Sequence, residues 1–142
     1  MMLLLIVGTY SIGRIETFKR TLKYTSSDFR LISNMLARMD RRIITPNIFT
    51  ETDNFCRQLP EKEYDAVSRT MVRLCAEFME VYTPSRDALS HPLYSRLGIT
   101  DCITLALASE KHLVITDDFA LANRITSMGG DAININHLRR FD

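Results

Sequence analysis

The stretch HLVITDDFALANRITSMGGDAINI, residues 112–135, decides the fold class of this chain. It opens with His112–Thr116, a nearly continuous apolar run of the kind found in parallel strands that are buried on both faces. A helix is expected from Phe119 to Met128, closed by two glycines, and Asp131–Ile135 has the pattern of another strand. Strand, helix and strand in this order predict a parallel strand pair.

The rest of the chain continues this alternation. Short runs at Ile43–Thr45 and Glu80–Thr83 predict two more strands. Apolar residues at helical spacing predict helices over residues 26–39, 46–59, 61–79, 85–89 and 101–110. Ser26, Pro46 and Thr100 are the expected start signals of three of them. We therefore predict one α/β domain over residues 1–142, with a mainly parallel central sheet between layers of helices, three layers in all.

The apolar start of the chain, Met1–Val7, admits two interpretations. It is too short to span a bilayer, and it has neither a basic leader nor a small-residue cleavage site. A buried strand and the first turn of a helix both fit its composition. If it were not buried, it would be a candidate surface for contact with another protein.

Composition is that of an ordinary globular protein, with 46% apolar and 25% charged residues. The formal net charge of +1 gives no strong field, so a nucleic-acid enzyme of this composition would depend on local basic patches. Cys56, Cys75 and Cys102 form no C-x-x-C pair and are interpreted as reduced core cysteines of a cytoplasmic protein. The histidines, at 91, 112 and 137, lack zinc-ligand spacing and are expected at the surface or in turns.

Four acidic residues stand at or near the ends of predicted strands, where chemistry takes place in parallel sheets. Glu51 follows the strand at 43–45 and is expected beside Ile48 and Phe55, at the edge of a buried stripe. Asp101 opens a helix, and Asp117 and Asp118 directly follow the strand at 112–116. Each has a structural explanation: a rim ion pair for Glu51, a dipole interaction for Asp101, and a helix cap for one of the adjacent pair.

Taken together, the four acids favour a site that binds a divalent cation. Carboxylates held close together repel one another unless a cation neutralises them. Their hard oxygen atoms suit Mg²⁺ or Mn²⁺, and such ions activate water and stabilise charge on a phosphate under attack. The reaction class indicated is hydrolysis of a phosphodiester bond.

Four stretches of the chain resemble the PIN-domain nucleases, whose best-known members are ribonuclease toxins of prokaryotic toxin–antitoxin pairs. They are Thr45–Glu51, Gly98–Asp101, Leu113–Asp118 and the segment from Leu3–Gly8 through Phe18–Thr21. Each motif is short, but their order and spacing are fairly specific, and together they cover nearly the whole chain. The resemblance implies a metal-dependent ribonuclease, RNA as substrate, an antitoxin as a candidate partner protein, and a homodimer.

Carried over by position, the resemblance implies a catalytic and metal-binding role for Glu51, Asp101 and Asp118. In the family the last acid comes two residues after a threonine, so Thr116 makes that residue Asp118. Asp117, beside it, is implied as an additional or substitute metal ligand.

The chain departs from the family at its first acid. PIN nucleases carry an aspartate in an Asp-x-Asn segment after their first strand, and this chain has no aspartate before Asp28. The residues from Leu3 onward resemble the part of a PIN domain that comes directly after that segment. We therefore expect either an N-terminally truncated PIN-like domain or a degenerate one that acts as a protein-binding module. Because one carboxylate of four is missing, we expect weak binding of Mg²⁺ or Mn²⁺ and poor cleavage of RNA.

Two basic runs could contact phosphates, one formed by Arg14, Lys19, Arg20 and Lys23 and the other by Arg139 and Arg140. An ordinary solvated face explains them as well. A phospho-accepting receiver domain also gathers acids on a parallel sheet. Such a domain would have its acidic pair after the first strand and a lysine directly after a late strand. In this chain the acidic pair follows a late strand, and the predicted strand 131–135 leads to Asn136 and His137.

Overall fold

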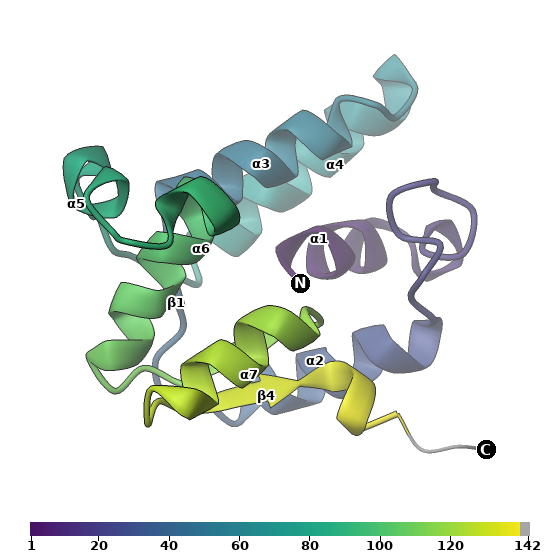
Figure 1. Cartoon of the computed structure of the whole chain (residues 1–142). Coiled ribbons are helices and arrows are strands. Elements are labelled where there is room, and N and C mark those ends of the chain that lie inside the picture. The colour runs from purple at the N-terminus through teal and green to yellow at the C-terminus, as the bar shows by residue number, and fades with distance from the viewer. Residues whose placement is uncertain (140–142) are drawn as a thin grey trace. The chain divides into compact units, whose positions relative to one another are not determined.

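The computed structural model describes residues 1–139 and contains both helices and short strands (Figure 1). The chain divides into two compact units, each described by itself: an N-terminal unit, Met2–Tyr82, and a C-terminal unit from Thr83 onward. The N-terminal unit contains α1 (Met2–Tyr10), η1 (Ile12–Arg14), α2 (Ser26–Ala37), β1 (Ile43–Ile44), α3 (Pro46–Cys56), α4 (Glu61–Cys75) and β2 (Met79–Glu80). The C-terminal unit contains α5 (Ser85–Leu89), α6 (Tyr94–Ser109), β3 (Val114–Thr116), α7 (Phe119–Ser127), β4 (Ala132–Asn134) and η2 (Ile135–His137).

The apolar start of the chain is the helix α1, which resolves the two interpretations left open by the sequence. Leu4, Ile6 and Val7 are completely buried, and α1 packs against α2, α3, α4 and η1. A helix that is apolar all round is stable only inside a protein core, because no side of it can face water. The segment is therefore the centre of the N-terminal unit and is not an exposed contact surface.

None of the helices within residues 1–139 combines the length and apolar character that crossing a bilayer requires.

Local capping signals set the starts of α2 and α3. The cap of α2 is Thr25, one residue earlier than the predicted Ser26, and it forms a capping box with Asp28. The Thr25 backbone N–H donates to Oδ2 of Asp28 at 2.8 Å, so the carboxylate satisfies a free donor at the helix start. Pro46 occupies the first turn of α3, as predicted, and Thr45, which was predicted as the end of a strand, caps this helix.

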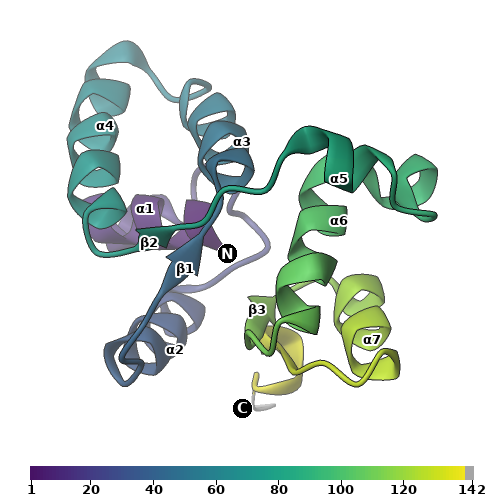
Figure 2. The ribbon, with the colours of Figure 1, turned by 90° about the vertical axis from the view of Figure 1, so that its left-hand side faces the viewer.

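Helices α3 and α4 lie side by side, joined by the turn at residues 57–60 (Figure 2). The α4 helix ends at Cys75, four residues before the predicted Met79. Its buried residues are Val67 and Thr70, so the buried face is narrow and leaves Cys75 exposed. The strand β2 then covers 79–80 instead of the predicted 80–83, and it pairs in parallel with β1.

The C-terminal unit is built on the strand–helix–strand stretch. Strands β3 and β4 pair in parallel, with Thr116 beside Asn134, and α7 connects them. Leu105, Ala108, Leu121 and Ile125 form the core between α6 and α7. Gly129, with φ of +78°, closes α7 as predicted, because a left-handed residue after a helix favours glycine.

The start of the long C-terminal helix differs from the prediction. The predicted helix is part of α6, which already begins at Tyr94 and contains a kink at Gly98. The φ and ψ values of Gly98, 80° and 176°, belong to a region that only glycine enters readily. Asp101 still lies in the first helical turn after this kink.

The described residues form two sheets of two parallel strands each, β1 with β2 and β3 with β4. The prediction of an α/β protein with parallel strand pairs is therefore confirmed. A single three-layer sheet is a finer statement and stays a prediction.

Candidate functional site

The acidic turn, residues 116–118, lies at the carboxyl end of β3. Thr116 is buried, and its Oγ1 accepts a hydrogen bond from the backbone N–H of Asp118 at 3.1 Å. Oδ1 of Asp118 accepts from the backbone N–H of Leu121 at 3.0 Å and so caps α7. The structural role foreseen for one of the two adjacent acids therefore belongs to Asp118. A carboxylate has several lone pairs, so this one bond leaves it able to bind a ligand as well.

A matching turn follows β4, where the side chain of Asn134 accepts from the backbone N–H of Asn136 at 2.9 Å. The Nδ2 group of Asn136 donates to the carbonyl oxygen of Asp117 at 2.8 Å and to Oδ1 of Asn134 at 2.9 Å. Asn136 thus ties the two strand ends together and fixes the backbone of the acidic turn. We did not predict either asparagine as a site residue. The signal that could have found them is the presence of asparagine at the end of a strand and just after it, because asparagine favours such turns.

Asn134 has one further property. Its side chain is only 3% exposed, and its Nδ2 is buried without a hydrogen-bond partner among residues 1–139. The orientation of this amide is fixed, because Oδ1 receives two bonds from Asn136. A buried donor without an acceptor costs roughly 1–3 kcal/mol. An acceptor oxygen next to this group would therefore stabilise the C-terminal unit.

Asp101 is half-buried in α6, three residues after Gly98. Its neighbour Cys102 is buried, and burial together with the charge of Asp101 raises the pKa of that thiol. Asp118 is thus the cap of α7, whereas Asp101 lies in the turn of α6 that follows the kink at Gly98.

Glu51 does not lie where the sequence predicted. It is exposed on α3, whereas Ile48 and Phe55 are half-buried and Thr52 and Cys56 face the core. Successive residues on a helix are about 100° apart, so a buried face centred on Thr52 and Cys56 turns Glu51 toward water. The prediction that Glu51 lies at the edge of a buried stripe is therefore wrong.

The acids are not gathered into a group of three in the described part of the chain. Within residues 1–139, no group of three or more histidine, cysteine, aspartate or glutamate side chains could hold a metal ion. Their oxygen donors suit Mg²⁺ or Mn²⁺, and binding of such an ion by these acids stays a prediction. Glu51 belongs to the other unit, so no geometry links it to Asp101, Asp117 or Asp118.

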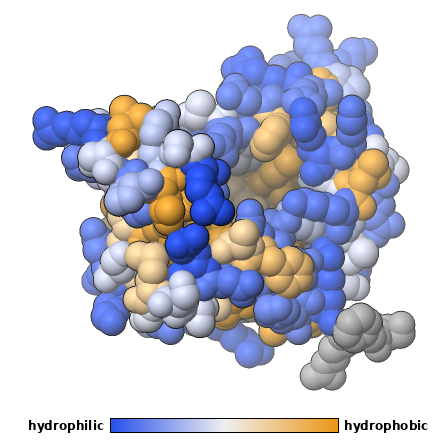
Figure 3. All heavy atoms as spheres, in the orientation of Figure 1, coloured by the Kyte–Doolittle hydropathy of each residue, from blue (hydrophilic) through white to orange (hydrophobic). Residues whose placement is uncertain are grey.

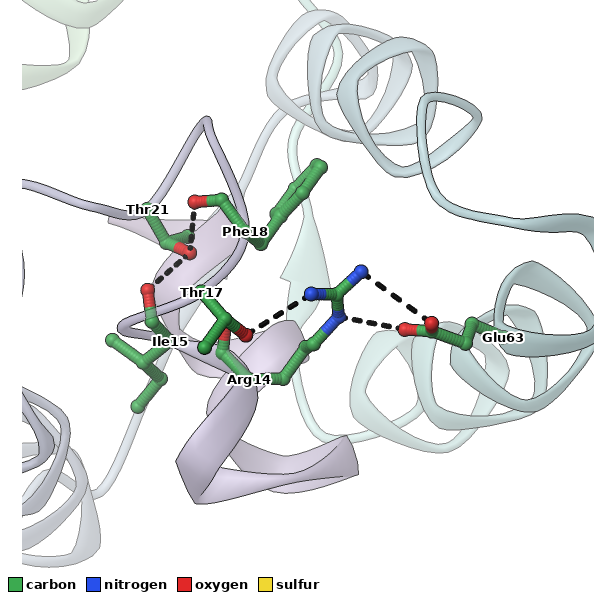
Figure 4. A network of polar contacts seen from close by, with 6 residues as sticks. All are labelled: Arg14, Ile15, Thr17, Phe18, Thr21 and Glu63. Carbon is green, nitrogen blue, oxygen red and sulfur yellow. Dashed lines mark hydrogen bonds and ion pairs between the residues drawn. The ribbon is translucent and has the colours of Figure 1, made fainter.

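Two residues of the first basic run, Arg14 and Arg20, bind neighbouring side chains; Figure 4 shows the contacts of Arg14. Nε of Arg14 lies 2.7 Å from Oε2 of Glu63 on α4, and its Nη1 donates to Oγ1 of Thr17 at 3.0 Å. Arg20 donates to the side chain of Gln58 at 2.8 Å and stacks over the ring of Phe55. These contacts favour a structural role for two of the four basic residues. In the second run, Arg140 lies outside the described residues.

The histidines lie at surfaces and turns, as predicted. Nδ1 of His91 accepts from the backbone N–H of Leu93 at 3.1 Å, in the turn between α5 and α6. His137 is exposed and packs against the ring of Phe119.

The cysteines differ in exposure. Cys56 and Cys102 are buried, whereas Cys75 is exposed, which corrects the prediction of three core cysteines. Burial, with a smaller contribution from Asp53, raises the pKa of the Cys56 thiol from 9.0 to about 12. The stabilisation that comes from keeping this thiol protonated is therefore present below pH 9 and is lost as the pH rises toward about 12.

We expect iodoacetamide at about pH 8 to modify only Cys75 in the folded protein, because the reactive thiolate is suppressed by burial at the other two positions. Mass spectrometry of the intact protein should show one adduct, and all three cysteines should react after unfolding. The variant Cys75→Ser should show no adduct when folded. Rapid modification of Cys56 in that variant would contradict the packing of α3.

No match emerged when the chain was compared with protein-family models, with curated proteins and with solved structures. The resemblance to PIN domains therefore depends on the short motifs of the sequence alone.

Proposed function

We propose that this chain is a PIN-type, metal-dependent ribonuclease that hydrolyses phosphodiester bonds in RNA. The observation that carries the proposal is the acidic turn: Asp117 and Asp118 follow a buried threonine at the carboxyl end of a parallel strand. This end of a parallel strand is where α/β proteins bind ligands. The tie from Asn136 to the backbone of Asp117 supports it, because a reacting group must be held in place.

The proposed catalytic and metal-binding residues are Asp118, Asp101 and Glu51, with Asp117 as an additional ligand. A divalent ion bound by carboxylates would lower the pKa of a bound water and offset charge on the phosphate. Within residues 1–139, these acids form no ready group of three. With no aspartate before Asp28, the proposed affinity for Mg²⁺ or Mn²⁺ is low and cleavage is slow.

The same proposal includes the finer fold, a three-layer PIN-like domain, and a cytoplasmic setting. It also includes RNA and an antitoxin protein as partners and a homodimer as the assembled form. The two parallel strand pairs and the free cysteines are compatible with these statements.

The test separates two roles of Asp118, as the observed cap of α7 and as a proposed metal ligand. Asparagine caps helices as well as aspartate does, so Asp118→Asn should leave the free energy of unfolding within about 0.5 kcal/mol of wild type. It should nevertheless lower Mn²⁺-dependent cleavage by at least about tenfold, because a ligating charge is lost. Asp118→Ala should lose the cleavage and also about 1 kcal/mol of stability. Labelled single-stranded RNA on denaturing gels and thermal unfolding provide the two measurements.

Asp87→Asn is the matched control, because Asp87 is an exposed carboxylate on α5 with only a loose contact to Arg86. This control should change neither the Mn²⁺-dependent cleavage nor the free energy of unfolding. Asp101→Asn should lower the cleavage of RNA as Asp118→Asn does. Cleavage that persists in EDTA, or that survives both Asp101→Asn and Asp118→Asn, would show that these acids do not catalyse it.

A second candidate function is a non-catalytic PIN-like module that binds a partner protein. The observation in its favour is that the carboxylate of Asp118 already serves as the cap of α7. This candidate predicts no Mn²⁺-dependent cleavage and no heat of Mn²⁺ binding in calorimetry. Slow cleavage that depends on Asp118 would exclude it.

A further inference from the structure

The N-terminal unit contains an open groove between the end of α1 and the middle of α4. It has a volume of about 650 Å³ and is lined by Thr9, Tyr10, Ala66, Arg69, Thr70, Val72 and Arg73. The lining residues of α4 are mostly three or four positions apart and so share one side of the helix. Because the groove is open to solvent, it suits an extended or helical segment better than a small molecule that must be enclosed.

Two arginines give the groove its charge. Arg69 and Arg73 are one helical turn apart and both are exposed. Within residues 1–139, neither guanidinium lies within ion-pair distance of a carboxylate, and Arg73 makes only a long bond of 3.4 Å to Oγ1 of Thr70. Arg14 and Arg57, in contrast, each pair with a carboxylate of the same unit. Two like charges held one turn apart repel each other, so an anionic partner would relieve a destabilising contact.

The groove also presents apolar surface. Val72 is 73% exposed, although it belongs to the same helix as the fully buried Val67. Figure 3 shows a face of the molecule that is mostly polar, with apolar residues in small separate patches. Val72 and Tyr10 both line the groove, so an apolar side chain of a partner could contact them, and such contacts form the centre of protein interfaces.

We propose that this groove binds an acidic, amphipathic segment of a partner protein. Carboxylates of the segment pair with Arg69 and Arg73, and an apolar side chain packs against Tyr10 and Val72. Guanidinium groups recognise carboxylates in a planar, two-pronged geometry, which gives the contact its specificity. The inference does not depend on the proposed nuclease function, since it concerns other residues.

Charge and composition favour a protein segment over RNA as the occupant. RNA binding draws its affinity from several phosphate contacts, whereas this groove offers two arginines in a mostly apolar lining. The net charge of the whole chain, +1, adds no further attraction.

The test uses a short synthetic peptide with two glutamates four positions apart and a leucine between them, and a copy with glutamine in place of glutamate. Amide NMR spectra should show shifts at Thr9, Tyr10 and residues 66–73 when the glutamate peptide is added. The glutamine copy should bind about tenfold more weakly, because two exposed ion pairs are lost.

The double variant Arg69→Glu with Arg73→Glu should no longer bind the glutamate peptide but should bind a lysine version of it. Binding of the lysine peptide would show that the double variant is still folded. Arg96→Glu, an exposed position on α6, is the matched control and should bind the glutamate peptide as wild type does. Equal binding of the glutamate and glutamine peptides would overturn the proposal. So would groove shifts caused by a single-stranded RNA oligonucleotide but not by the glutamate peptide.

Discussion

Replacing Ile6 with alanine is expected to destabilise the N-terminal unit by about 2–5 kcal/mol. Ile6 is 0% exposed in a helix that packs against three other helices, so the lost methylene contacts leave a cavity that neighbours fill only in part. Chemical denaturation followed by circular dichroism measures the change. For a unit of this size the thermal midpoint should fall by roughly 10 °C or more.

Thr9→Ala on the same helix is the control for this experiment. Thr9 is exposed, and alanine favours the helix, so stability should change by no more than about 0.5 kcal/mol. A loss of less than about 1 kcal/mol in Ile6→Ala would mean that α1 is not the core helix of its unit.

Gly8→Ala is expected to cost about 1–2 kcal/mol, although alanine is the better helix former. A Cβ atom at Gly8 would overlap the ring of Phe29 on α2, with Cγ of that ring only 2.7 Å away. Cγ is next to the Phe29 backbone, so the ring cannot move aside without a new rotamer or a wider spacing of α1 and α2. The free energy of unfolding from urea titration measures the effect.

A double-mutant cycle with Phe29→Leu identifies the cause. In the Phe29→Leu background, Gly8→Ala should lose most of its cost, because the overlapping ring is gone. Gly13→Ala is the matched glycine control: a Cβ there meets nothing within 4 Å, so the change should be neutral or slightly stabilising. An unchanged cost of Gly8→Ala in the Phe29→Leu background would assign the effect to something other than the contact of α1 with α2.

The candidate site was predictable where it depends on neighbours in sequence. The acidic turn after β3, and the cap that one of its two acids provides, follow from a threonine, two aspartates and an apolar run. The tie from Asn136 to Asp117 was not predictable, because it joins residues 19 positions apart across a parallel strand pair. The exposure of Glu51 was missed for a related reason: the buried face of α3 is chosen by the elements that pack on it.

By itself the sequence determined the helix–strand alternation, the start of α3 at Pro46, the span of α5 and the glycine end of α7. Each of these depends on hydrogen bonds and dihedral preferences within a few residues. Only the tertiary structure decided that the apolar start is a buried helix, that Cys75 is exposed and that Arg14 pairs with Glu63. The physical reason is that burial and long-range pairing depend on which surfaces meet, and local periodicity does not encode that.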